Sequence, residues 1–161
     1  MNQPNQKQVR IGMLTPSSNT VVEPWCFKMF NSFENTSVHF GRVEVLWIDD
    51  KAASFSQFYD ENMLKGFDLL SHVKPMVIGW NGTSASWLGI DRDRILIDLI
   101  TKRTGCPAVT STLSIIEALN ALNISKIGLV TPYVDSIQKK IITNYFLFFK
   151  YNFVGLNVFG K

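Results

Sequence analysis

Three short segments place small hydroxyl and amide side chains directly after apolar stretches of strand length. They are Thr15-Pro16-Ser17-Ser18-Asn19-Thr20, Asn81-Gly82-Thr83-Ser84 and Thr131-Pro132-Tyr133. Each offers backbone N–H groups and a hydroxyl or amide, without a nearby Lys, Arg, His or metal-ligand cluster. Such neutral donors suit a small carboxylate, and the glycine fingerprints of nucleotide sites are missing. We therefore expect an anion site with no metal and no phosphate cofactor.

The elements that must position these segments follow from the hydrophobic pattern. Buried strands are expected over residues 9–15, 37–47, 75–80, 107–109, 126–130 and 153–159. Between them, apolar residues three and four apart predict helices, with capping boxes at Thr20/Glu23 and Ser54/Gln57 and one helix ending near Gly105. Pro24 is also compatible with a start of the first helix a few residues after Thr20. Single helices between apolar strands predict an α/β fold, a parallel sheet with helices on both faces. Ligands of such sheets bind at the carboxyl ends of the strands, where all three segments lie.

Three of the expected helices have a predicted core face. The helix after Glu23 should bury Trp25, Met29, Phe30 and Phe33. The helix after Ser54 should bury Phe55, Phe58, Tyr59, Met63, Leu64 and Phe67, and the helix that opens at Asp135 should bury Ile137, Ile141, Tyr145 and Phe148.

Composition restricts the class of protein. The chain has 161 residues, 46% of them hydrophobic, which is enough for one domain with a buried core. Its net charge of +3 comes from 16 basic and 13 acidic residues scattered along the sequence, without the basic stripe typical of nucleic-acid binding. No apolar stretch reaches membrane-span length, and residues 1–8 are a polar tail without a signal-peptide core. We expect a cytoplasmic protein that binds neither nucleic acid nor membranes.

Only two cysteines occur, Cys26 and Cys106, and their spacing fits neither a metal site nor a disulfide framework. We expect both to be buried, reduced side chains without a chemical role.

A six-residue pattern occurs twice. Ile11-Gly12-Met13-Leu14-Thr15-Pro16 reappears 116 residues later (127 minus 11) as Ile127-Gly128-Leu129-Val130-Thr131-Pro132. One explanation is that strand-to-helix corners commonly contain Gly and Pro; the other is a duplicated half-domain. Duplication predicts a first half over 9–122 and the start of a second over 123–161, a pseudo-symmetric arrangement whose second half looks incomplete. It would place the counterpart of Gly82 at about residue 198 (82 plus 116).

Together the three segments resemble the maleate cis-trans isomerase and arylmalonate decarboxylase group of the aspartate/glutamate racemase superfamily. The resemblance rests on Thr15 to Thr20 with Glu23-Pro24, on Gly82-Thr83-Ser84, and on Thr131-Pro132-Tyr133 with Asp135, and it covers the chain from Val9 onward. It implies two similar α/β halves that face each other across an active-site cleft, with a small dicarboxylate substrate and no cofactor.

The resemblance also implies roles for individual residues. Asn19, with the backbone of Pro16, Ser17 and Ser18, would hold a substrate carboxylate, and Asn81 and Gly82 would join them in binding substrate. Thr83, Ser84 and Tyr133 would be catalytic, because they would donate hydrogen bonds to a carboxylate or to the enediolate formed from it, as an oxyanion hole.

Two departures from the family pattern bear on the reaction. Where the racemases and isomerases have a cysteine before Thr-Ser, this sequence has Gly82, as arylmalonate decarboxylases do. The family's protonating cysteine would fall near position 198, and neither Cys26 nor Cys106 matches it. The resemblance therefore favours a cofactor-independent lyase that decarboxylates a small disubstituted malonate. The alternatives are a maleate isomerase or racemase-like enzyme, and a truncated relative that binds small carboxylates without turnover.

Simpler explanations exist for some of these residues. Asn81-Gly82 also fits a tight turn in which the glycine has positive φ, and Trp80 and Trp87 fit core packing as well as a pocket wall. The aromatic residues near the carboxyl end would be buried by a complete second half, or would otherwise drive self-association into a homo-oligomer. They are Tyr145, Phe146, Phe148, Phe149, Tyr151, Phe153 and Phe159.

Overall fold

The structure, a computed structural model, describes residues 8–45, 61–149 and 152–158. Its elements are β1 (Val9–Pro16), α1 (Val22–Phe30), β2 (Thr36–Val43), α3 (Glu61–Ser71), β3 (Val77–Trp80), α4 (Ala85–Leu88), α5 (Asp91–Thr104), β4 (Ala108–Thr110), α6 (Ser111–Ala121), β5 (Lys126–Thr131), α7 (Asp135–Phe149) and β6 (Asn152–Val158). The strands are parallel throughout, in a four-stranded sheet of order β2-β1-β3-β4 and a two-stranded sheet of β5 and β6. The predicted α/β class is confirmed.

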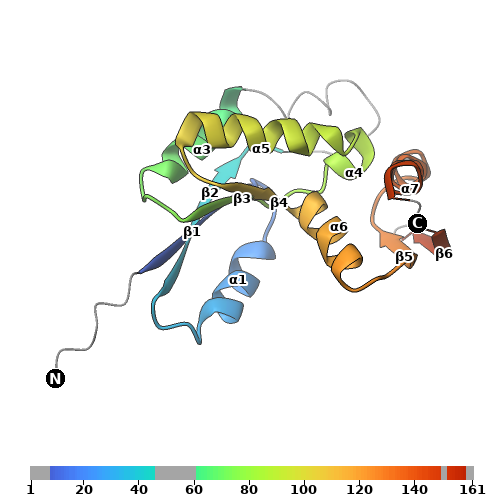
Figure 1. The fold of residues 1–161 in the computed structure, drawn as a ribbon, viewed down its shortest axis with the longest axis horizontal. Coiled ribbons are helices and arrows are strands. Elements are labelled where there is room, and N and C mark those ends of the chain that lie inside the picture. Colours follow the sequence, from blue (N-terminus) through green and yellow to red (C-terminus); the bar gives the residue numbers. More distant parts are fainter. Residues whose placement is uncertain (1–7, 46–60, 150–151, 159–161) are drawn as a thin grey trace.

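Helices cover both faces of the four-stranded sheet. α3 and α5 lie on one face, and α1 and α6 lie on the other (Figure 1). The core between the sheet and its covering helices is apolar, with Leu14, Phe67, Ile78 and Ile100 at 0% exposure. Burial of a side chain of this size contributes about 1.5–3 kcal/mol, so this packing holds the strand ends in place.

Helix α5 shows how its local sequence defines its ends. Asp91 and Asp93 lie in its first turn, at the positive end of the helix dipole. Lys102 and Arg103 lie in its last turn, at the negative end. Gly105 ends the helix in the left-handed region at φ 70°, with its N–H donating to Thr101 O. The predicted helix end at Gly105 is confirmed.

The predicted capping box of the first helix is wrong. Instead of Thr20 and Glu23, the Oδ1 atom of Asn19 accepts hydrogen bonds from the backbone N–H of Val21 and of Val22, each at 2.9 Å. Asn side chains compete well for such free N–H groups, and the helix begins at Val22, one residue later than a cap at Thr20 requires. Glu23 pairs with Arg42 instead, at 2.9 Å.

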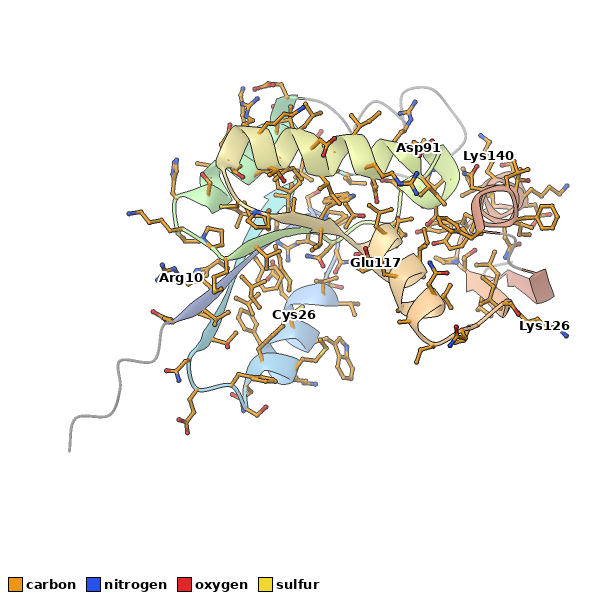
Figure 2. All side chains as sticks on the ribbon, in the orientation of Figure 1. Arg10, Cys26, Asp91, Glu117, Lys126 and Lys140 are labelled. Carbon is orange, nitrogen blue, oxygen red and sulfur yellow. The ribbon has the colours of Figure 1, made fainter. Side chains whose placement is uncertain are left out.

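The predicted core face of α1 is also wrong. Trp25, Met29 and Phe33 are 58%, 62% and 58% exposed, and the buried residue of the helix is Cys26. The face turned to the sheet is set by Cys26, whose Sγ lies 3.6 Å from Met13 Sδ on β1. Figure 2 shows Cys26 on α1 beneath the sheet.

The other predicted elements occur with shifted ends. In α3, Met63 and Phe67 are buried as expected and Leu64 is partly buried. The predicted cap at Ser54 and Gln57 and the predicted core residues Phe55, Phe58 and Tyr59 lie outside the described residues. β2 ends at Val43, four residues before the predicted strand end. In α7, three of the four predicted core residues are buried, Ile137, Ile141 and Tyr145, and nothing is described for the Phe148 side chain.

The two-stranded sheet and α7 connect to the rest of the molecule through α4. Ser86 Oγ and Tyr145 Oη are 3.3 Å apart, and Asn144 Nδ2 donates to Ser86 O at 3.0 Å. We call these two contacts the α4–α7 clasp. The division into halves at residue 122 remains a prediction, as does self-association through the aromatic carboxyl end. In the described part of the chain, no helix combines the length and hydropathy that crossing a membrane requires.

Candidate functional site

Residues that follow five strands line one cavity of about 730 Å³, called the larger cavity below. Its lining comes from the segments after β1, β2, β3, β4 and β5, together with the start of α1 and Trp87 of α4. The lining residues are Pro16, Ser18, Asn19, Thr20, Val21, Val22, Val45, Asn81, Gly82, Thr83, Ser84, Trp87, Ser111, Pro132 and Tyr133. The three segments singled out in the sequence therefore meet at one place.

All of the predicted site residues line this cavity except Ser17. The N–H of Ser17 donates to Val43 O at 2.7 Å, and its Oγ accepts from the N–H of Val45 at 3.2 Å. The Oγ of Ser18 donates to Val45 O at 3.0 Å. Both serine hydroxyls thus fasten the turn after β1 to the residues that follow β2, Ser17 as an acceptor and Ser18 as a donor.

Asn19 lines the larger cavity and has one side-chain atom left for a ligand. Its Oδ1 is occupied by the two N–H groups of Val21 and Val22, and because both partners are donors, the oxygen and nitrogen of the amide are distinguished. The remaining polar atom of the side chain is Nδ2, which only donates. A residue that caps a helix with one atom can therefore offer the other to an anion.

Arg42, on β2, supports the same turn and was not singled out from the sequence. Its Nη1 donates to Ser17 O at 2.8 Å and to Asn19 O at 2.9 Å, while Nη2 contacts Glu23. The guanidinium thus holds two carbonyl groups of the turn in a fixed orientation. Arg42 is more than 20 residues from the turn in the sequence and is part of no motif with it. The parallel pairing of β1 and β2 brings the Arg42 side chain to the turn.

Two side chains in the turn after β3 carry buried polar atoms that no described residue satisfies. These are Ser84 Oγ and Asn81 Nδ2, and Ser84 is 1% exposed. A buried polar group without a partner costs about 1–3 kcal/mol, which a ligand with acceptor oxygens would recover. The backbone of the turn is held independently, because the N–H of Asn81 donates to Leu14 O at 2.8 Å.

Gly82 is not explained by a tight turn. The described glycines with positive φ are Gly89 and Gly105, so the turn explanation is wrong at this position. A Cβ atom placed on Gly82 would lie 2.3 Å from Cζ2 and 2.4 Å from Cε2 of Trp80. The residue must be glycine because the indole of Trp80, itself 1% exposed, occupies the space of a side chain.

Tyr133 forms the opposite wall. Its ring packs on Trp87 with centroids 5.0 Å apart and planes at 56°. Tyr133 and Thr83 also line a smaller cavity of about 260 Å³, whose other lining residues are Ser86, Ile115, Leu119, Ile127, Gly128, Leu129, Thr131, Ile141 and Tyr145. A donor-rich cavity and a mostly apolar one therefore adjoin at two predicted catalytic residues.

The larger cavity contains few titratable groups. Among the described residues that line it, Tyr133 alone has a side chain that titrates. Cys26 and Cys106 lie elsewhere: burial raises the pKa of the Cys26 thiol, and Cys106 Sγ contacts Pro75 O at 3.6 Å. Both are free thiols; Cys26 is buried as predicted, whereas Cys106 is only partly buried.

Asp93, at the start of α5, is a buried carboxyl group next to the turn between β4 and α6. It is 0% exposed, and neither oxygen has a well-formed hydrogen bond among the described residues. Burial raises the pKa of Asp93 to about 6, and the nearby hydroxyls of Thr110 and Thr112, which favour the ionised form, only partly oppose the rise. Ser111, between these two threonines, lines the larger cavity.

Comparisons with known proteins agree with the resemblance seen in the sequence. Residues 11–159 match the family model described as arylmalonate decarboxylase, and a comparison with curated proteins finds no match. The fold is similar to that of the maleate isomerase from Pseudomonas putida S16, with a TM-score of 0.82 and 20% identity over 96% of this chain and 65% of that one.

Two further solved structures have the same fold. Unliganded arylmalonate decarboxylase has a TM-score of 0.67 and 19% identity over 95% of this chain and 63% of that one. A mutant of the Nocardia farcinica maleate cis-trans isomerase, with a covalently bound succinylcysteine intermediate, has a TM-score of 0.72 and 20% identity over 93% of this chain and 64% of that one. The chain spans less than two thirds of the length of each of these three structures. It belongs to the arylmalonate decarboxylase family, in the superfamily of Asp/Glu racemase-like proteins.

Proposed function

We propose that the protein is a cofactor-independent decarboxylase that acts on a small disubstituted malonate. The observation that carries the proposal is the meeting of the two cavities. Neutral donors from Asn19, Asn81 and Ser84 line the larger cavity, and a mostly apolar cavity adjoins it at Thr83 and Tyr133. Membership in the arylmalonate decarboxylase family supports the same reaction class.

The donors suit the charge changes of such a reaction. A malonate carries two carboxylates on one carbon, and we assign one of them to the Asn19 amide and the hydroxyls of Thr83, Ser84 and Tyr133. When the bond to the other carboxylate breaks, its electron pair moves to the retained carboxylate, CO2 leaves, and an enediolate remains. Fixed donors aimed at oxygens that gain charge lower the barrier, by about 3 kcal/mol for one donor.

Apolar surroundings contribute at the departing group. A carboxylate loses favourable hydration next to aliphatic side chains such as those of Ile115, Leu119 and Ile127, whereas CO2 is neutral and loses much less. The smaller cavity would therefore favour loss of charge. The enediolate must then take a proton on carbon, and the described lining of the larger cavity includes no thiol, imidazole or carboxylic acid.

This last observation favours a second candidate, a protein that binds small carboxylates without turnover. Isomerisation through a cysteine adduct, as in the Nocardia farcinica enzyme, has less support because position 82 is glycine and has no room for a side chain. Racemisation by a thiol at that position fails for the same reason.

The experiment combines a CO2-release assay on alkyl- and aryl-substituted malonates with calorimetric titration of malonate, maleate and aspartate. We expect binding and CO2 release, both reduced in Ser84→Ala. Ser71→Ala, which removes a hydroxyl that donates to Asp68 O on α3, is the matched control. Binding without CO2 would support the second candidate, and the absence of both would reject both. Deuterium incorporation at the substrate α-carbon in D2O, without CO2 release, would point to isomerase or racemase chemistry.

A further inference from the structure

We propose that Arg42 is a positioning residue of the larger cavity. By holding two carbonyl oxygens of the turn after β1, it aims two backbone N–H groups, those of Ser18 and Thr20, at a bound carboxylate. The use of these donors for a substrate rests on the proposed function. The hold of Arg42 on the turn depends on no ligand, and a separate measurement tests it.

Arg42 contacts the turn at two points and the following helix at a third. Its Nη1 donates to Ser17 O at 2.8 Å and to Asn19 O at 2.9 Å. Its Nη2 lies 2.9 Å from Oε1 of Glu23, in the first turn of α1. The described lining of the larger cavity includes neither Arg42 nor Glu23. The guanidinium therefore acts on a ligand through the turn and not by direct contact.

The geometry of the peptide unit relates these carbonyl groups to the cavity. A peptide unit is planar, and in its trans form the C=O and the N–H point in opposite directions. No cis peptide bond occurs in the described part of the chain. The oxygen atoms of residues 17 and 19 point to Arg42, so the N–H groups of Ser18 and Thr20 point away from it. Both of these residues line the larger cavity, which puts the two donors on its side of the turn.

The remaining N–H groups of the turn already have partners within the protein. That of Ser17 donates to the last residue of β2 at 2.7 Å, and that of Asn19 donates to Pro16 O at 3.0 Å. Among the described residues, none accepts a hydrogen bond from the N–H of Ser18 or of Thr20. Alternate N–H groups of the turn therefore serve the fold, and those between them are left for a ligand.

A charged donor at a carbonyl oxygen also strengthens the N–H of the same peptide unit. Hydrogen bonds polarise one another along a chain, and a bond with an ionised partner is about twice as strong as a neutral one. The guanidinium of Arg42 therefore strengthens both donors from outside the cavity. Its own charge is paired with that of Glu23, so this contribution is local.

The shape of the Arg42 side chain matters beside its charge. A guanidinium is a rigid planar fork, whereas the ammonium of lysine is a point charge on a flexible stem. The fork holds both carbonyl groups and the Glu23 carboxylate in one arrangement. Arg42→Lys keeps the charge and loses the fork, so it is the variant that separates charge from position.

The first test requires no ligand. The carbonyl-carbon NMR signals of Ser17 and Asn19 report the hydrogen bonds that these oxygens accept, and loss of such a bond moves a signal upfield. We expect both signals to move upfield in Arg42→Met and to stay in place in Arg10→Met. Arg10 is the matched control, because its Nε donates to the backbone oxygen of Lys74 at 3.3 Å, at the amino end of β1. Unchanged signals in Arg42→Met would overturn the proposal.

The second test is titration with malonate, followed by calorimetry and by amide-proton NMR. Arg42→Met should weaken binding about tenfold or more, because two donors lose their fixed direction. Arg10→Met should bind as wild type does. In wild type the amide protons of Ser18 and Thr20 should move downfield as malonate binds, and in Arg42→Met they should move much less.

Two results of this titration would overturn the positioning role. One is equal affinity of wild type and Arg42→Met, or binding to wild type without a shift at Ser18 and Thr20. The other is full recovery of affinity in Arg42→Lys, which would show that charge alone acts; we expect this variant to bind nearly as weakly as Arg42→Met. Thermal unfolding establishes that each variant is folded at the titration temperature, and Arg42→Gln replaces Arg42→Met if the latter is not.

The two proposals fail in different ways. Binding of malonate without CO2 release would contradict the decarboxylase and leave the role of Arg42 intact. Absence of any carboxylate binding by wild type would overturn the role of Arg42 toward a ligand together with the proposed function. The carbonyl signals of the first test would then still decide whether Arg42 holds the turn.

Discussion

β1 and β5 start from the same six-residue pattern and end in different surroundings. β1 pairs with β2 on one side and β3 on the other, and Leu14 and Thr15 on it are 0% exposed. Within the described residues, β5 pairs with β6 alone, and Val130 is 56% exposed. The pattern is therefore sufficient for a parallel strand followed by a polar turn. How deeply the strand is buried depends on its neighbours.

The larger cavity draws on both regions. The four-stranded region supplies Asn19, Asn81, Thr83 and Ser84 from well-packed strand ends, and the two-stranded region supplies Tyr133. The contacts between the two regions include the α4–α7 clasp and the packing of Tyr133 on Trp87. We therefore expect the donors of the four-stranded region to be held firmly by packing. We expect Tyr133 to be held less firmly, because it belongs to the less buried two-stranded region.

The largest expected effect compares the same substitution in each region. Ile100→Ala, at 0% exposure on α5, should lower the free energy of unfolding by about 4 kcal/mol. Ile141→Ala, at 4% exposure on α7, should lower it by about 2 kcal/mol. The difference is expected because Ile141 already borders the smaller cavity and has fewer packed neighbours to lose.

Urea unfolding measures both values, and Ile95→Ala, 61% exposed on the same helix as Ile100, is the control and should change stability by less than about 0.5 kcal/mol. A cost for Ile141→Ala equal to that of Ile100→Ala would remove the distinction between the regions.

The second prediction concerns the contribution of the two-stranded region to the reaction. Tyr133→Phe should lower kcat for CO2 release by a factor of about 100 or more, because one donor to the enediolate is lost, with little change in stability. Tyr145→Phe removes a hydroxyl that contacts Ser86 outside the larger cavity, so it should affect stability more than rate. Wild-type rates in Tyr133→Phe would exclude this residue from the mechanism.

The third prediction uses the buried carboxyl group of the four-stranded region. Asp93 has a pKa of about 6 in the folded protein against 3.8 ordinarily, so between these pH values the folded state holds a proton that the unfolded state has lost. Stability should therefore fall as the pH rises through about 6, by at most about 3 kcal/mol. Asp93→Asn should remove this part of the pH dependence.

Chemical unfolding at pH values from 4 to 8 measures the effect. Asp91→Asn is the control. Asp91 lies two positions before Asp93 in α5, is exposed, and forms an ion pair with Arg94. An unchanged pH profile in Asp93→Asn would show that another group is responsible.

The smallest expected effect concerns the α4–α7 clasp. Ser86→Ala removes the side-chain contact with Tyr145 and leaves the backbone contact with Asn144 in place. The loss of one buried hydrogen bond should lower the free energy of unfolding by about 1 kcal/mol. Thermal unfolding of Ser86→Ala is compared with that of Ser71→Ala, a change on helix α3 outside the clasp. Equal effects of the two substitutions would show that the α4–α7 clasp makes no specific contribution to stability.

The sequence predicts the strands, the convergence of the three turns and the end of α5, since these depend on local hydrophobic patterns and glycine chemistry. It fails where a side chain has several available partners. The free N–H groups at the start of α1 donate to Asn19 rather than to Thr20. The face of α1 that is turned to the sheet depends on the packing of Cys26 against Met13. Arg42 acts across the pairing of β1 and β2, so no local pattern indicates its role at the turn after β1.

The described lining of the larger cavity carries no charged side chain, and this affects how a ligand arrives as well as how it stays. The field of hydrogen-bond dipoles falls off faster with distance than that of a full charge, so such a site exerts little long-range attraction on a dianion. Encounter is then governed by diffusion and shape rather than by steering, and the association rate should respond only weakly to ionic strength.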